Sequence, residues 1–230
     1  MIPHLWKAPT LVLVGTLLMG LCASGSEAQA EWYVGGDFGG VFPNNLSNIE
    51  GTGTALGVSA AGTQFNDLQT SAGVSFGLKV GHYFSSKPWL GVEGNFQASY
   101  PEVKTQTFNG SGPSLIVTGS VTEGNADVYV PSLNLMVRYP GKRFQPYAGV
   151  GPAVAIIKTF DNGSTSTNVG VNVLAGLRFF LDKELSLFTE YQYLRTTFDS
   201  DHALSSTLGV KGDYSASHLL VGFAVHFDRK

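Results

Sequence analysis

The chain has 230 residues and a formal net charge of -3, with 43% hydrophobic but only 13% charged residues. Its length suits one all-β domain, and the acidic balance excludes nucleic-acid binding, which needs a basic surface. A mean hydropathy close to zero excludes a bundle of transmembrane helices. Low charge, 29 glycines and 12% aromatic residues are typical of sheets that face lipid.

Residues 1–30 have the parts of a secretory signal peptide: a positive start, an apolar centre at 11–21 and the small-x-small site AQA ending at Ala30. A membrane-anchoring helix is the alternative, but the apolar run falls short of the about 20 residues that span a bilayer. Cys22 lies in this segment, where a leucine before it disfavours a lipoprotein signal. We predict cleavage after Ala30, which leaves residues 31–230 as one domain without disulfides.

Eight segments then alternate apolar and polar residues with a period of two, the pattern of strands and not of helices. In chain order they are 31–41, 72–84, 89–100, 127–139, 144–158, 169–181, 185–193 and 214–227. Long polar loops are expected at 42–71, 101–126, 159–168 and 196–213, and tight turns elsewhere. Within the second loop, the stretch SLIVTGSVT at 114–122 is expected to extend a barrel strand beyond the membrane.

One face of each strand is apolar, and the other carries small, amide and charged residues. Val74, Phe96, Val173 and Val221 are examples of the apolar set. In 144–158 both faces are small and apolar, so their assignment is ambiguous. Long loops that alternate with tight turns are the layout of outer-membrane barrels. We therefore predict an all-β fold, an eight-stranded antiparallel up-and-down transmembrane β-barrel, with a soluble lipocalin-like barrel as the alternative.

Six charged residues fall on the inward faces of these strands: Asp37, Lys79, Glu93, Arg138, Arg178 and Glu190. We expect Lys79 to lie between Asp37 and Glu93, and Arg178 to face Glu190 across the central hairpin. Buried charges are tolerated when they are paired, and side chains can fill an eight-stranded barrel. The charges should thus form a structural plug with Asn95, Gln97, Asn134, Asn172, Gln192, His218 and His226. A gated ion path and an active site are the alternatives.

Aromatic residues gather at the strand ends of the outward face. At the turn side these are Trp32, Phe84, Trp89, Tyr139 and Phe227, and at the loop side Tyr100, Tyr129 and Tyr193. Such positions suit two girdles at the membrane interfaces, although ordinary strand propensity would also favour aromatic residues.

Four stretches carry a family resemblance: WYVGG at 32–36, PYAGVG at 146–151, the hairpin 170–193 and the ending LLVGFAVHF at 219–227. In order and spacing, the mature chain is similar to OmpA/OmpX-type eight-stranded outer-membrane β-barrels, especially the opacity-antigen-like outer membrane protein β-barrel group. The resemblance implies the outer membrane of a Gram-negative cell. It also implies that the insertion machinery reads the C-terminal strand at an aromatic residue such as Phe227, which three charged residues follow here.

The resemblance implies a structural or surface-interaction role, in envelope integrity or adhesion, through the long loops. A small transport channel or a carrier of hydrophobic molecules is the alternative. We expect a monomer whose partners are outer-membrane lipid, lipopolysaccharide and an unknown surface ligand, with no nucleic acid, cofactor or metal. Barrel lipid A deacylases carry a His-x-Ser pair near the C-terminus, which His218 and His226 lack. The set around His202 resembles a hydrolase site only superficially, so no enzyme is expected.

Overall fold

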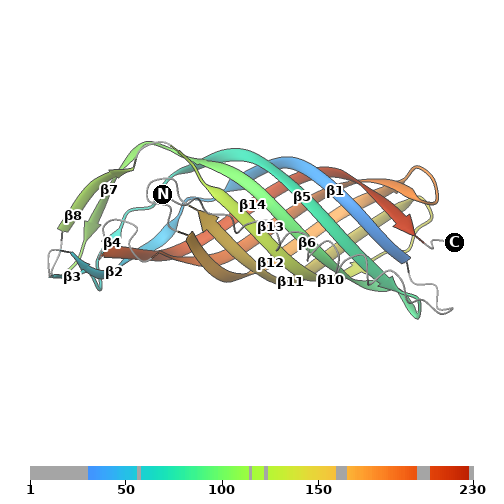
Figure 1. Ribbon diagram of the computed structural model, residues 1–230, viewed down its shortest axis with the longest axis horizontal. Helices are drawn as coiled ribbons and strands as arrows, with labels where there is room; N and C mark the ends of the chain where they lie inside the picture. Colours follow the sequence, from blue (N-terminus) through green and yellow to red (C-terminus); the bar gives the residue numbers. More distant parts are fainter. Residues whose placement is uncertain are drawn as a thin grey trace, which may run out of the picture.

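The computed structural model describes residues 31–55, 58–113, 116–121, 124–158, 165–200 and 208–227. The predicted signal peptide lies outside these ranges. Figure 1 shows the described strands wound around one long axis. Among the described residues, no helix has the length and apolarity that a membrane crossing requires.

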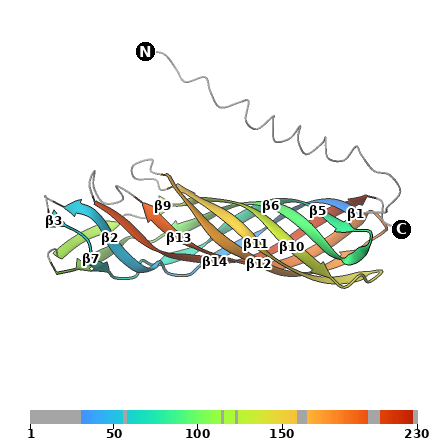
Figure 2. The same cartoon turned by 90° about the horizontal axis from the view of Figure 1, so that it is seen from below.

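In the described part of the chain, eight long strands form a closed ring with antiparallel pairing between neighbours. They are β1 (Glu31–Pro43), β5 (Thr70–Phe84), β6 (Lys87–Val103), β10 (Asp127–Arg138), β11 (Phe144–Lys158), β12 (Thr165–Phe180), β13 (Leu185–Ser200) and β14 (Leu208–Phe227). The ring closes because β1 pairs with both β5 and β14. The predicted eight-stranded up-and-down β-barrel is therefore confirmed, and Figures 1 and 2 show its tilted strands.

Side chains of the barrel strands alternate between the outside and the interior. Leu78 and Phe96 point outward and are 67% and 45% exposed, whereas Lys79 and Glu93 point inward and are 3% and 0% exposed. The same parity holds in β11, where Val150 is exposed as predicted. The apolar face is thus on the outside, which excludes a soluble barrel that buries this face in a dry centre.

Tight turns join β5 to β6, β10 to β11 and β12 to β13 at the end of the barrel where β14 finishes, which we call the turn end (Figure 1). In the last of these turns, Asp182 Oδ1 accepts the backbone N–H groups of Leu185 and Glu184, each at 2.7 Å. These two hydrogen bonds hold the pKa of the Asp182 carboxyl below its usual range, because they stabilise the carboxylate.

The expectation of long loops at 42–71 and 101–126 is wrong. These segments form β2 (Ser47–Ala55), β3 (Val58–Ser59), β4 (Gln64–Phe65), β7 (Gln106–Ser111), β8 (Ile116–Val121) and β9 (Gly124–Asn125). The stretch 114–122, expected to extend a barrel strand, contains β8, which pairs with β7 instead. β14 begins at Leu208, earlier than predicted, and its extra length pairs with β2. From there the sheet continues through β4 and β7 to β8. We call β2, β4, β7 and β8 the outer sheet, which projects from the loop end of the barrel (Figure 1).

The outer sheet is tied to the barrel by polar contacts with β14. Glu50 and Lys211 form an ion pair at 3.1 Å, and Asn48 Nδ2 donates to Asp213 Oδ2 at 2.7 Å. Asn48 has a φ of 54°, a left-handed conformation that asparagine tolerates better than most residues. These strands bury few large apolar side chains, among them Ile49 and Phe65, which are 2% and 8% exposed, so the period-two apolar pattern that predicts a strand is weak in them.

Candidate functional site

In the middle of the lumen, the Lys79 ammonium group binds two buried carboxylates. Lys79 Nζ lies 2.8 Å from Glu190 Oε1 and 3.3 Å from Asp37 Oδ2, and all three side chains are wholly buried. Tyr147 donates its hydroxyl to Glu190 Oε2 at 2.7 Å. Lys79 therefore links β1, β5 and β13, and Tyr147 adds β11 to the same network.

Lys79 takes a partner that the sequence did not indicate. We expected Glu93, on the neighbouring strand, to be its second anion. Glu93 Oε2 instead accepts the Tyr33 hydroxyl at 2.6 Å, and the second anion is Glu190 on β13. A barrel brings distant strands face to face across its interior, and the long lysine stem can reach them.

Arg178 is likewise not paired with Glu190. The register places Arg178 opposite Phe188, two residues nearer the turn than Glu190. Its guanidinium lies over two aromatic rings, 4.3 Å from the centroid of Tyr33 and 5.1 Å from that of Tyr147. Cation–π contacts of this kind stabilise a desolvated arginine. The sequence signal for them was that both tyrosines fall on the inward face of their strands.

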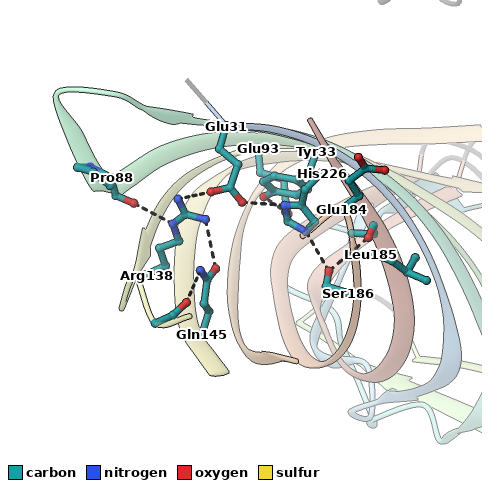
Figure 3. A network of polar contacts seen from close by, with 12 residues as sticks. Glu31, Tyr33, Pro88, Glu93, Arg138, Gln145, Glu184, Leu185, Ser186 and His226 are labelled. Atoms are coloured by element: carbon teal, nitrogen blue, oxygen red, sulfur yellow. Dashed lines mark hydrogen bonds and ion pairs between the residues drawn. The ribbon is translucent and has the colours of Figure 1, made fainter. Parts of the chain in front are cut away.

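At the turn end of the lumen, Glu31 joins two basic side chains (Figure 3). Its Oε2 lies 2.6 Å from Arg138 Nη2, and its Oε1 lies 2.7 Å from His226 Nδ1. Arg138 also donates to the Pro88 carbonyl at 2.8 Å. The expected network omitted Glu31, although parity in β1 puts it on the same face as Asp37. This cluster links β1, β6, β10 and β14 across the mouth.

Ser186, His226 and Glu31 are joined in the order that a serine hydrolase uses, with Ser186 Oγ 2.9 Å from His226 Nε2. A nucleophile must reach a substrate carbonyl and needs donors for the oxyanion. Ser186 is 0% exposed, and the N–H groups of the preceding turn are bound to Asp182. We therefore interpret the chain of contacts as a cross-link of the mouth. His202 lies outside the described residues.

Beyond the charges, the lumen changes first to amides and then to apolar side chains. Asn172 donates to Asn134 at 3.2 Å, and Gln97 donates to Asp37 at 3.3 Å. The loop half of the interior is filled by Val41, Val128, Val130, Ala153, Ala155, Leu194, Tyr214 and Ala216. The predicted plug named only polar and charged residues, so the apolar filling of this half was not predicted, although both faces of 144–158 carry small apolar residues.

Most of the aromatic residues expected in girdles lie near strand ends, but Tyr193 lies in the middle of β13, which continues to Ser200. Beside the turns, Tyr139 and Trp89 are 69% and 48% exposed, and Trp32 pairs with Phe227. Toward the loop end, the Lys158 ammonium lies 5.2 Å from the centroid of the Tyr129 ring. Their contact with lipid headgroups stays a prediction. Among the described residues, no group of three or more His, Cys, Asp or Glu side chains is placed to hold a metal ion.

The outer sheet ends on a strand with an open edge. β8 pairs with β7 from Ile116 opposite Ser111 to Val121 opposite Gln106, and no other strand among the described residues pairs with it. Its six residues, IVTGSV, include no charge and no proline, and Ile116 is 81% exposed. Natural edge strands usually carry charges, prolines or bulges that block further pairing. β8 therefore presents an edge that is open to another strand.

Comparison with known proteins agrees with this architecture. A family model of the outer membrane protein beta-barrel domain matches residues 12–227. The crystal structure of outer membrane protein OprG from Pseudomonas aeruginosa aligns with a TM-score of 0.57 and 16% identity, covering 86% of this chain and 96% of that one. Neisserial surface protein A (NspA) aligns with a TM-score of 0.50 and 15% identity, covering 89% and 100%. These identities show the fold alone. No curated protein matches the chain.

Proposed function

This chain belongs to the outer membrane protein beta-barrel domain family and lies in the outer membrane, and we propose that it acts there as a surface-interaction protein with a closed lumen. Its partner would be an extended polypeptide that adds a strand to the outer sheet. Adhesion is the role that such binding would serve.

The open edge of β8 is the observation that carries this proposal. An extended peptide can pair with an exposed edge through main-chain hydrogen bonds, while alternate side chains set the specificity. β8 has no charged residue, so an uncharged partner segment could pair with it without burying a charge. The outer sheet projects beyond the loop end of the barrel (Figure 1), so the bilayer would not obstruct a partner.

Lysines on the β8 edge should weaken adhesion. We expect the double variant Thr118→Lys and Ser120→Lys, both at exposed positions, to lower adherence of cells that display the full chain by about tenfold, the effect of losing about 1.4 kcal/mol of binding. The measurement compares binding to a protein-coated and a polysaccharide-coated surface. Thr107→Lys, exposed on the neighbouring β7, is the matched control. Unchanged adherence of the double variant to protein would refute the proposal.

The apolar cluster in the loop half of the lumen favours a second candidate, a carrier of hydrophobic molecules. Buried apolar side chains there, such as Val41 and Leu194, offer a small hydrophobic molecule better surroundings than water. Against this, Val41 and Ala155 are both 0% exposed, so the cluster would have to open before anything entered.

Planar-bilayer recording separates the closed barrel from a channel. We expect no discrete openings from the wild-type protein, because Lys79 and its buried anions block the path. A fluorescent hydrophobic probe added to the protein in detergent should likewise show no saturable binding. Sustained openings would establish a channel, and saturable binding that Leu194→Arg abolishes would establish the carrier.

A further inference from the structure

The barrel closes where its first strand meets its last, and the sequence of β1 specifies that register weakly. Residues 34–41 read VGGDFGGV, so the glycine pair recurs after four residues. A shift of β1 by four residues along β14 keeps every outward side chain outward, since only odd shifts exchange the faces. The same shift also places the first glycine pair of this stretch opposite the β14 residues that the second pair faces in the native register. Hydrophobic pattern and glycine spacing therefore leave two registers open.

We infer that Glu31 selects the native register by binding His226 and Arg138 at the turn end of this seam. Its carboxylate meets the imidazole on β14 at 2.7 Å and the guanidinium on β10 at 2.6 Å. Since a carboxylate only accepts hydrogen bonds, both partners donate to it. This inference concerns closure of the barrel and does not depend on the surface role proposed above.

The partners of Glu31 are themselves held in place (Figure 3). The His226 ring contacts Ser186 Oγ at 2.9 Å, and its backbone N–H donates to the Glu184 carbonyl at 2.6 Å. Arg138 is fixed by two further acceptors, the carbonyl of Pro88 and the side chain of Gln145. Glu31 therefore meets a preformed pair of donors from two different strands.

A shift by four residues would move Glu31 by about 13 Å along β14, at 3.2–3.4 Å per residue. That distance exceeds the reach of a glutamate side chain, so the contact with His226 on β14 would be lost. Arg138 lies on β10, which β5 and β6 connect to β1, and it holds Glu31 on the β1 side of the seam. The other acid of β1, Asp37, binds Lys79 on β5 and Gln97 on β6. It therefore makes no direct bond to β14, and Glu31 is the acid that does.

Disulfide trapping tests the register directly. The only cysteine is Cys22, within the predicted signal peptide, so the mature chain supplies a cysteine-free background. Val34→Cys with Val225→Cys reports the native register, in which these residues are direct partners. Val34→Cys with Val221→Cys reports the shift by four. Folded protein is oxidised, and the linked fraction is measured by mass spectrometry.

With Glu31 present, only the native pair should link. In Glu31→Gln and Glu31→Asp, we expect the shifted link to rise at least tenfold, because the amide loses the charge and the shorter acid cannot reach both donors. Ser186→Ala, which leaves both Glu31 contacts in place, is the control and should stay native. The inference would be established if the shifted disulfide forms in both Glu31 variants and not in Ser186→Ala. It would be overturned if either Glu31 variant folds and forms only the native disulfide.

Discussion

Replacing Lys79 by methionine is expected to destabilise the barrel by about 3–5 kcal/mol, the usual cost of removing one partner from a buried ion pair. The substitution keeps the apolar stem but leaves Asp37 and Glu190 buried without their cation. Urea unfolding of the protein in lipid vesicles, followed by tryptophan fluorescence and by migration on unheated gels, measures the loss.

Two comparisons decide whether the loss comes from the buried network. Lys87→Met removes an exposed lysine at the β5–β6 turn and should change the free energy of unfolding by less than about 0.5 kcal/mol. The double variant Lys79→Met with Glu190→Gln should cost less than the sum of its parts, because it removes an unpaired charge. If Lys79→Met costs no more than Lys87→Met, water reaches the network and the lumen is not closed.

Placing arginine at the adjacent position, Leu78→Arg, is expected to cost about 2–4 kcal/mol, the range for a cation facing lipid near the bilayer midplane. Leu78 is 67% exposed on the outward face, well away from both ends of β5. The unfolding measurement in vesicles applies here too, and detergent micelles should reduce the effect.

Tyr139→Arg is the matched control for depth. Tyr139 is 69% exposed but lies beside the turn that follows β10, where a cation costs about 0–1 kcal/mol. A cost for Leu78→Arg as small as that for Tyr139→Arg would mean that water, and not lipid, covers the outer face. Leu78 must therefore be apolar and Lys79 must be charged although they are adjacent in the chain, because successive side chains of a strand point to opposite faces.

The barrel itself was predictable because period-two alternation is a local signal. The pattern at Val74, Phe76 and Leu78 against Ser75 and Lys79 assigns each side chain to a face without knowledge of any other strand. The turn chemistry is equally local, as the Asp182 turn illustrates. The limits of β13 and β14 were predicted less accurately, because both strands continue beyond the outward apolar band into segments whose polar residues, such as Asp199 and Lys211, are typical of loops.

The partners within the candidate sites were not predictable in the same way. Lys79 and Glu190 are separated by 111 residues, and nothing local relates them. Glu93 lies on the strand next to that of Lys79, and adjacency of strands is the only pairing that a local pattern predicts. Glu31, the first residue of the predicted strand, was not among the predicted inward charges, although it shares a face with Asp37. The outer sheet was not predicted because it buries few large apolar side chains: Ile49 on β2 and Phe65 on β4 are 2% and 8% exposed, and most other positions are glycine or polar.

Sequence alone determined which side of each strand meets lipid, and hence the fold class and its membrane location, since these depend on the order of apolar and polar residues along one strand. Only the tertiary structure decided which charged side chains pair inside the barrel and how β1 is aligned with β14. It also decided that the segments between barrel strands build a sheet with an open edge. Those features arise from closure of the ring, which brings together residues that are distant along the chain and separates some that adjacent strands would have paired.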